Sequence, residues 1–317
     1  MTNFFRFKLN LRGLLAAAGS LASLTTLTAF LGRFWWGFDL TSHFRVQYAA
    51  VLFLLAAVLC ILRRWKTAAV FAAFTAVNCV IVIPYCYTGR PLPLPVHHKL
   101  RVLTLNVHAE NRQANLVEAF IRKADPDLFL LEEVNKKWLK SLAGLRALYP
   151  YSVEWPFEDD FGIALFSKRP LENPETLWLG DAEVPSVTAY IQTESKPVRV
   201  LGMHPVPPVG AENARFHKQQ LEAIPKLIAP WGKTILLLGD LNSTPWSPRF
   251  QKLLHDTGLV DSARGYGIQT TWPLFLYPLR IPVDHCLIST DLRVSARQIG
   301  GDVGSDHLPL LVDIALD

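Results

Sequence analysis

The hydrophobic positions of this chain follow two different patterns, and the first of them fills the first third of the sequence. Three apolar runs without a charged residue lie at residues 13–32, 46–62 and 67–89 and contain 20, 17 and 23 residues. A helix needs about 20 apolar residues to cross the hydrocarbon core of a bilayer. A buried helical domain is the alternative, but the helices of a soluble bundle need polar faces that these runs lack. The pattern therefore predicts three transmembrane helices, at about residues 13–32, 46–62 and 67–87.

The second pattern begins at residue 99 and consists of short apolar or alternating runs separated by polar segments. Runs of this kind predict strands, and apolar residues spaced three or four apart predict helices. Strands and helices that follow each other in this way indicate an α/β or α+β layered domain. We expect strands at residues 100–107, 127–131, 162–167, 187–192, 198–203, 234–238, 283–288 and 309–314, and helices at residues 115–123, 136–148 and 212–228.

Between the two patterns, residues 90–98 contain three alternating prolines. Prolines cannot continue a helix, and they favour an extended polyproline II backbone. The sequence therefore predicts a membrane anchor at residues 1–89, a short linker at residues 90–98 and a second domain at residues 99–317.

The distribution of charge sharpens this division. Half of the 317 residues are hydrophobic and 19% are charged, with a mean hydropathy of +0.20, which excludes a disordered chain. The formal net charge of +5 combines +8 on residues 1–98 with −3 on residues 99–317. The positive excess therefore belongs to the anchor, and it is no evidence that the second domain binds a polyanion.

Lysine and arginine cluster on two flanks of the apolar runs, at residues 6–12 and at residues 63–66. Basic flanks stay on the cytoplasmic side of a membrane. This rule predicts an integral protein of a bacterial-type inner or plasma membrane, with the second domain extracytoplasmic. The basic residues before the first run also fit a cleaved signal peptide, and in that case the two later runs still anchor the protein.

Polar residues follow several of the predicted strands, at the sheet edge where layered α/β domains expose their sites. An aspartate after a glycine at a single strand end is more often a turn former than a catalytic group. Six such motifs in one domain, rich in Asp, Asn, Glu and His, instead indicate a hard cation with acid and base groups beside it. They are Leu103-Thr-Leu-Asn106, Leu130-Leu-Glu-Glu133, Leu201-Gly-Met-His204, Leu237-Leu-Gly-Asp240-Leu-Asn242, Pro282-Val-Asp284-His285 and Gly304-Ser-Asp306-His307.

The order of these motifs resembles that of the endonuclease/exonuclease/phosphatase superfamily, the deoxyribonuclease-I-like hydrolases that cleave phosphoesters with Mg²⁺. The resemblance covers about residues 99–316, and its most specific parts are Gly239-Asp-Leu-Asn242 and Gly304-Ser-Asp-His-Leu-Pro309. It implies a four-layer α/β/β/α sandwich, in which two mixed sheets pack together with helices outside.

The resemblance also implies a cation site built from three residues. Glu133 corresponds to the family's Mg²⁺-binding glutamate, Asn106 lies beside it, and Asp306 joins the set. This chain has Glu132-Glu133 where the family commonly has Gln-Glu, and adjacent side chains of a strand point to opposite faces, so only one of the two is expected to reach the metal. Mg²⁺ keeps several waters and needs few carboxylates, so this set suffices; Mn²⁺ is the alternative cation.

The same resemblance assigns the reacting groups. Asp240 corresponds to the aspartate that orients or deprotonates the attacking water, and Asn242 to the amide that holds the phosphate and that aspartate. His307 is expected to face the scissile phosphate, with Asp284 fixing its tautomer. His204 resembles the second active-site histidine of the nuclease branch. Because water is the nucleophile, no covalent intermediate is expected.

Other candidates rest on weaker signals. Asp160, which precedes a predicted strand, is either a carboxylate partner for His204 or a solvated turn acid. His285 should point away from Asp284 along the strand, and we expect it to be structural. Five other histidines have no partner that the sequence reveals: His97, His98, His108, His217 and His255.

The substrate depends on loops, because the superfamily's nucleases, inositol-phosphate phosphatases and sphingomyelin-type phosphodiesterases share their catalytic residues. Residues 265–283 carry an apolar face that includes Trp272, and this face either packs on its own domain or contacts a bilayer or an acyl chain. The charge of −3 argues against nucleic acid, which needs clustered Lys and Arg, although Arg112, Arg215 and Arg249 could offset it locally.

The sequence thus predicts a membrane-anchored, Mg²⁺-dependent phosphodiesterase that works by metal-assisted in-line water attack, first of all on a nuclease-type substrate. Its expected partners are a lipid bilayer and a phosphodiester in nucleic acid or in a lipid headgroup. The alternatives are a phospholipid or sphingolipid headgroup phosphodiesterase, an inositol-phosphate-type phosphatase and a non-catalytic membrane scaffold.

Overall fold

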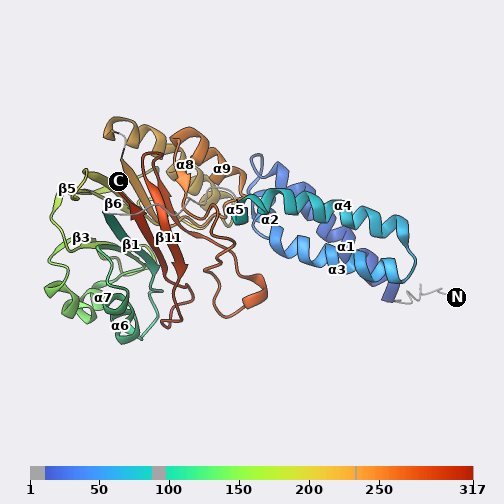
Figure 1. Ribbon diagram of the computed structural model, residues 1–317, viewed down its shortest axis with the longest axis horizontal. Helices are drawn as coiled ribbons and strands as arrows, with labels where there is room; N and C mark the ends of the chain where they lie inside the picture. Colours follow the sequence, from blue (N-terminus) through green and yellow to red (C-terminus); the bar gives the residue numbers. More distant parts are fainter. Residues whose placement is uncertain (1–10, 88–97, 233, 317) are drawn as a thin grey trace. The chain divides into compact units, whose positions relative to one another are not determined.

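The computed structural model describes residues 11–87, 98–232 and 234–316 (Figure 1). The chain divides into two compact units, Met1–Ile83 and Pro84–Asp317. Apart from residue 98, the predicted linker at residues 90–98 lies outside the described residues, as do residues 6 and 8 of the first basic flank.

The first unit is helical. Two stretches, Gly13–Leu31 and Trp65–Val82, are long and apolar enough to cross a membrane, which agrees with the first and third predicted spans. The middle run forms a helix that passes the same test only together with the short helix before it, and the two meet at a bend of 63°. The elements are α1 (Leu11–Thr28), η1 (Ala29–Leu31), α2 (Trp36–Ser42), α3 (Arg45–Ile61) and α4 (Trp65–Val82).

The outer surface of these helices is apolar. Leu21 is 63% exposed, Phe53 62% and Val80 72%, whereas small residues such as Ala56 and Ala68 pack inside. Exposed apolar side chains of this size and number suit a lipid environment better than water. The helix α2 was not predicted, because residues 33–45 contain no long apolar run.

The second unit contains two mixed six-stranded sheets. In the first sheet, the strand order is β11 (Arg293–Ile299), β12 (Leu310–Ala315), β1 (Lys99–Asn106), β2 (Leu128–Glu132), β4 (Ile163–Ser167) and β3 (Tyr151–Trp155). In the second sheet, it is β5 (Leu171–Trp178), β6 (Pro185–Ile191), β7 (Val198–Met203), β8 (Ile235–Asp240), β10 (Asp284–Ile288) and β9 (Val260–Asp261). The pairs β1–β2 and β7–β8 are parallel and the other pairs are antiparallel.

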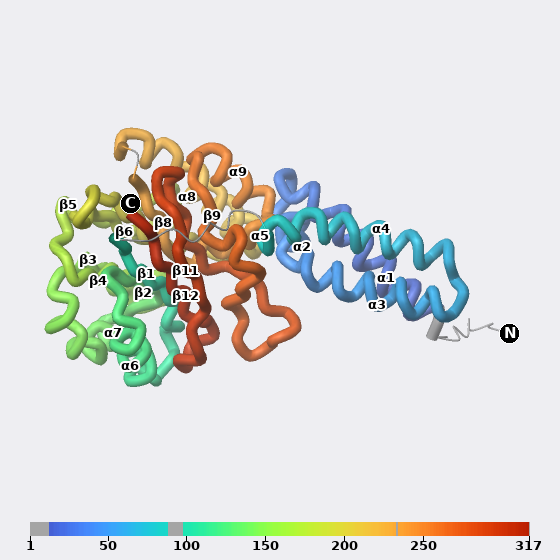
Figure 2. Tube along the Cα trace, in the orientation of Figure 1, coloured from blue at the N-terminus to red at the C-terminus, as the bar shows by residue number. Residues whose placement is uncertain are grey.

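Helices cover the outer face of each sheet, so the domain has four layers. One apolar core lies between the sheets, and includes Leu100, Leu130 and Leu236. The helices α6 (Ala114–Ala124) and α7 (Lys136–Ser141) cover the first sheet, and α8 (Ala211–Ile228) and α9 (Pro248–Thr257) cover the second (Figure 1). Figure 2 shows β1 and β12 side by side, although they begin and end the domain. The predicted α/β/β/α sandwich is therefore confirmed.

The predicted strands and helices of this domain are present, with ends shifted by at most two residues, except that the helix predicted at residues 136–148 is divided. It forms α7 and the 3-10 helix η2 (Ala143–Ala147), with Leu142 between them. The short elements α5 (Pro84–Tyr87), η3 (Ala229–Trp231) and η4 (Tyr277–Leu279) complete the domain.

Residues 84–87 lie within the third predicted span, which the structure divides into α4 and α5. The elements that were not predicted, besides the short η3 and η4, are β3, β5, β9, β11 and α9. Strands β5 and β11 have mostly exposed side chains, so they show little apolar alternation. The helix α9 did carry a signal, because Ser247 caps its N-terminus, Pro248 follows, and Gly258 ends it in a left-handed conformation.

Candidate active site

The predicted site residues of both sheets meet at one edge of the sandwich. Asn106 ends β1, Glu133 follows β2, His204 follows β7 and Asp240 ends β8. These four strands form the parallel pairs of the two sheets, so their carboxyl ends open toward the same edge. The antiparallel strand β10 begins there with Asp284, which lies opposite Asp240 in the ladder.

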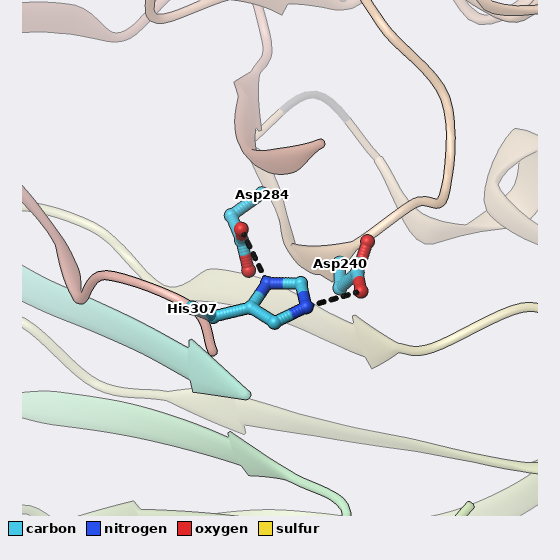
Figure 3. Close-up of side chains that lie close together, drawn as sticks. All are labelled: Asp240, Asp284 and His307. Atoms are coloured by element: carbon cyan, nitrogen blue, oxygen red, sulfur yellow. Dashed lines mark hydrogen bonds and ion pairs between the residues drawn. The ribbon is translucent and has the colours of Figure 1, made fainter. Parts of the chain in front are cut away.

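His307 lies between two buried carboxylates (Figure 3). Its Nδ1 is 2.9 Å from Asp284 Oδ2, and its Nε2 is 3.7 Å from Asp240 Oδ2. Burial opposes a charge on the imidazole, but Asp284 and Asp240 outweigh that effect and raise the pKa of His307 to about 10. The ring is therefore a cation at neutral pH, with its Nδ1–H donated to Asp284 and its Nε2–H directed at Asp240.

Asp240 is the centre of the remaining contacts. His204 Nε2 is 3.5 Å from Asp240 Oδ2, and the backbone N–H of Asn242 donates to Asp240 Oδ1 at 2.8 Å. Burial raises the pKa of Asp240 to about 7, against the attraction of His307, and burial lowers the pKa of His204 to about 4. A carboxylate that titrates near neutral pH, next to a neutral imidazole, can accept a proton from water.

The residues predicted to hold the cation form a second cluster. Asn106 Nδ2 donates to Glu133 Oε1 at 2.7 Å, and the backbone N–H of Ala109 donates to Glu133 Oε2 at 3.0 Å. Trp272 Nε1 donates to Asp306 Oδ2 at 2.9 Å, whereas Asp306 Oδ1 is buried without a hydrogen-bond partner. An oriented carboxylate with an unpaired buried oxygen fits a divalent cation, because such an oxygen needs a positive partner.

Among the described residues, one group of acids and histidines satisfies the distances of a metal site, because ligand atoms of Asp240, Asp284 and His307 lie within 4.8 Å of one another. In that group, Asp284 already engages His307 Nδ1. The carboxylates and amide around Glu133 offer the hard oxygen donors that Mg²⁺ and Mn²⁺ prefer. Glu133, Asn106 and Asp306 therefore stay the predicted cation ligands, beside the buried group of Asp240, Asp284 and His307.

Glu132 points away from this cluster and into the core between the sheets. Its Oε1 accepts hydrogen bonds from Thr104 Oγ1 at 2.7 Å and from the backbone N–H of Asp240 at 3.2 Å. Burial raises the pKa of Glu132 well above its usual range.

Glycine is required at position 239, where φ is 140° and a Cβ would lie 1.9 Å from Met203 O.

The structure places His108 next to two of the predicted cation ligands, which the sequence did not reveal. His108 Nδ1 lies 3.5 Å from Glu133 Oε2 and 3.7 Å from Asp306 Oδ1. The periodicity around His108 carries no signal of this position, because His108 follows a strand in an irregular segment.

Asp160 is exposed, and in the described part of the chain its carboxylate forms neither a hydrogen bond nor an ion pair with His204.

Two further histidines are buried away from the reacting groups. His285 Nε2 lies 2.8 Å from Ser243 O and its ring packs on Phe250. His217 Nε2 lies 3.0 Å from Leu241 O. Both contacts support the segment that follows β8, so these side chains act on the shape of the site.

The order and geometry of these residues agree with a comparison against known families. A profile described as the Endonuclease/Exonuclease/phosphatase family matches residues 103–307. The chain belongs to this family. Membership identifies the endonuclease/exonuclease/phosphatase domain as a hydrolase of phosphoester bonds and its members as divalent-metal-dependent enzymes. A comparison with curated proteins gave no match.

Solved structures share the fold of this endonuclease/exonuclease/phosphatase domain. Humanized TDP2 from D. rerio has 14% identity and a TM-score of 0.58, over 68% of this chain and 98% of that one. The 3′ phosphatase NExo from Neisseria, bound to a product DNA hairpin, has 19% identity and a TM-score of 0.57, over 67% and 98%. Sphingomyelinase C from Streptomyces griseocarneus has 19% identity and a TM-score of 0.53, over 69% and 99%.

Proposed function

We propose that this protein is a membrane-anchored, divalent-metal-dependent phosphodiesterase of nuclease type. The observation that carries the proposal is the position of Asp240, which lies within 3.5 Å of His204 and 3.7 Å of the His307 ring that Asp284 holds. The basic flanks of the apolar helices support an extracytoplasmic position of the catalytic domain.

In this proposal Asp240 orients the attacking water and takes its proton, since its pKa lies near 7. The imidazolium of His307 donates from Nε2 to a nonbridging phosphate oxygen, and Asp284 keeps the Nδ1 proton in place. The Asn242 amide donates one N–H to Pro205 O at 3.0 Å, and its other N–H and the neutral ring of His204 supply further hydrogen bonds to the phosphate. A divalent cation, when bound beside Glu133 and Asp306, neutralises negative charge that develops on the phosphate.

A cavity of about 360 Å³ beside the cation cluster supports a nucleic-acid substrate. It begins at Ala109, whose backbone N–H donates to Glu133, and its charged lining residues are one acid and two bases, Glu110, Arg112 and Lys137. The two basic side chains outnumber the acid in this cavity, so they can bind flanking phosphates of a polynucleotide, although the domain as a whole is negative.

The test compares substrates on the purified full-length protein in detergent. DNA, RNA, phospholipid and inositol phosphates are incubated with Mg²⁺, with Mn²⁺ or with EDTA. We expect DNA or RNA to be cleaved with metal, and Asp240→Asn and His307→Ala each to lose about 10²-fold to 10⁴-fold in kcat. Asp181→Asn, which changes an exposed aspartate, is the control. A wild-type protein without metal-dependent turnover on any of these substrates is a scaffold, and the proposal is then wrong.

The alternative substrate is a lipid headgroup, and one observation favours it. Phe275 and Tyr277 are 79% and 76% exposed at the tip of the loop whose base holds Trp272 against Asp306. Exposed aromatic side chains of this kind enter the interface of a bilayer. Phe275→Ser with Tyr277→Ser should then slow hydrolysis of a phospholipid in vesicles and leave a soluble phosphodiester unaffected. Equal effects on both substrates would remove the lipid interpretation.

A further inference from the structure

We propose that Tyr85 is a positioning residue for the active site, because it holds the segment of residues 241–247 that follows β8 and carries Asn242. The short helix α5 then belongs to the catalytic scaffold, and the catalytic domain begins at Pro84 rather than at residue 99. The inference rests on the proposed function for the role of Asn242. It adds a residue that the sequence placed inside a membrane span.

The segment of residues 241–247 joins the proposed base to helix α9, and Asn242 is its one residue that is not buried. The backbone N–H of Asn242 donates to Asp240 Oδ1 at 2.8 Å, and its side chain donates to Pro205 O at 3.0 Å. Asn242 has φ 48°, a left-handed conformation that few residues with a side chain adopt. A shift of this segment would therefore move the amide of Asn242 and the hydrogen bond on Asp240 together.

Three alternate carbonyl groups of the segment, at positions 241, 243 and 245, each contact a side chain from a different element. His217 of α8 lies with Nε2 3.0 Å from the first carbonyl oxygen, and His285 of β10 lies with Nε2 2.8 Å from the second. Tyr85 of α5 donates its hydroxyl to the third at 3.3 Å. Buried carbonyl groups need such partners, so Tyr85 completes the support of the segment at its far end.

Tyr85 is itself fixed inside the catalytic domain. It is 5% exposed, and its ring packs edge to face on Trp246, with the ring centroids 6.2 Å apart. Gln251 Nε2 donates to the Tyr85 hydroxyl oxygen at 3.2 Å, and it also donates to the carbonyl group at position 245. The backbone N–H groups of Gly265 and Gly267 donate to Tyr85 O at 2.9 Å and 3.1 Å. Both the side chain and the backbone of Tyr85 are thus held, so Tyr85 can keep the segment in place.

The place of Tyr85 along the chain adds to the meaning of these contacts. The last stretch that is apolar enough to cross a membrane ends at Val82, and Tyr85 follows three residues later. The chain that leaves this stretch therefore contacts the segment of residues 241–247 before the proline-rich residues 90–98 begin.

The experiment uses the full-length protein in detergent, and its first measurement needs no activity. Hydrogen–deuterium exchange with mass spectrometry follows the backbone amides of residues 241–247. The second measurement is kcat on bis-p-nitrophenyl phosphate, a soluble phosphodiester, with Mg²⁺ or Mn²⁺. Tyr85→Ala removes the ring and the hydroxyl, whereas Tyr85→Phe removes the hydroxyl alone. If circular dichroism shows that Tyr85→Ala is unfolded, Tyr85→Leu takes its place with the same expected results.

Two tyrosines of the same domain supply matched controls. Tyr87→Ala changes an 80% exposed tyrosine of the same short helix. Tyr149→Ala changes a tyrosine that is 1% exposed and packs on Phe129, on the outer side of the first sheet. The second control separates a general loss of stability from a displacement of the segment.

We expect Tyr85→Ala to speed exchange in residues 241–247 about tenfold or more and to lower kcat about tenfold or more. Tyr85→Phe should keep both within about threefold of the wild type, because the ring still packs on Trp246 and Gln251 still donates to the carbonyl group. Tyr149→Ala should lower the urea midpoint with neither effect, and Tyr87→Ala should change nothing.

Unchanged exchange in Tyr85→Ala overturns the proposal, because the segment would then hold its place without the tyrosine. An equal rise of exchange in Tyr149→Ala also overturns it, since the effect would then be a general loss of stability. A wild type that cleaves no phosphodiester contradicts the proposed function alone, because the exchange measurement still decides whether Tyr85 holds the segment.

Discussion

The buried carboxylate of Glu132 accepts a hydrogen bond from the backbone N–H of Asp240 at 3.2 Å. Glu132 ends a strand of the first sheet and Asp240 ends a strand of the second. The contact therefore ties the two sheets together directly behind the residue that we propose as the base.

Replacement of Glu132 tests this link between the sheets. Glu132→Ala leaves the Thr104 hydroxyl and the Asp240 N–H without their acceptor, and we expect it to lower the free energy of unfolding by about 2–5 kcal/mol. Glu132→Gln keeps a neutral acceptor of the same length and should cost about 1 kcal/mol or less. Urea unfolding followed by tryptophan fluorescence measures both. Equal losses in the two variants would show that the carboxylate itself, rather than its acceptor oxygen, is required.

Gly239→Ala should prevent the site from forming. An added Cβ would lie 1.9 Å from Met203 O and 3.1 Å from Glu132 Oε1, at a φ of 140°. We expect a loss of about 4 kcal/mol or more in the free energy of unfolding. Gly258→Ala is the matched control, because Gly258 also has a positive φ but no atom within 4 Å of the added Cβ, and it should cost only about 1–2 kcal/mol.

Acid should destabilise the domain through His217. Burial lowers the pKa of His217 to about 4 from an ordinary value of 6.5. Between these values the unfolded chain binds the proton and the folded chain does not, so the free energy of unfolding falls as the pH falls from 6.5 to 4, by up to about 3 kcal/mol.

His217→Gln keeps an N–H donor for Leu241 O and cannot titrate, so its stability should depend less on pH in this range. Urea unfolding at pH 7, 6, 5 and 4 measures the difference, with the exposed His255→Gln as the control. The same slope for wild type and His217→Gln would mean that other groups carry the acid sensitivity.

Asp284→Asn tests the tautomer of His307. The amide can donate to Nδ1, so the ring would lose its Nδ1 proton, keep only the proton on Nε2 and lose its positive charge. We expect kcat for phosphodiester hydrolysis to fall by about 10²-fold to 10⁴-fold, with stability little changed. Asp256→Asn, which alters an exposed acid on α9, should retain full activity. If the Asp284 variant keeps its activity, the proposed role of the imidazolium is wrong.

Much of the fold was predictable because its signals are local. Apolar runs, alternation and turn residues indicated the helical first unit and most strands of the second unit. Strands β5 and β11 escaped prediction because most of their side chains are exposed, and a strand that buries few residues shows no clear alternation. The site residues Asp240 and His307 were found through motifs whose order along the chain can be compared directly.

By itself, the sequence determined that the chain has an apolar helical part and a layered α/β part, and that six polar motifs stand at or near the ends of strands in the second. It could do so because periodicity and motif order are properties of neighbouring residues. Only the tertiary structure decided that Glu132 faces the core behind Asp240, and that His108 faces Glu133 and Asp306. These contacts join segments far apart in the chain, and they depend on strand register, on the packing of the two sheets and on a left-handed residue after β1, none of which a local pattern encodes.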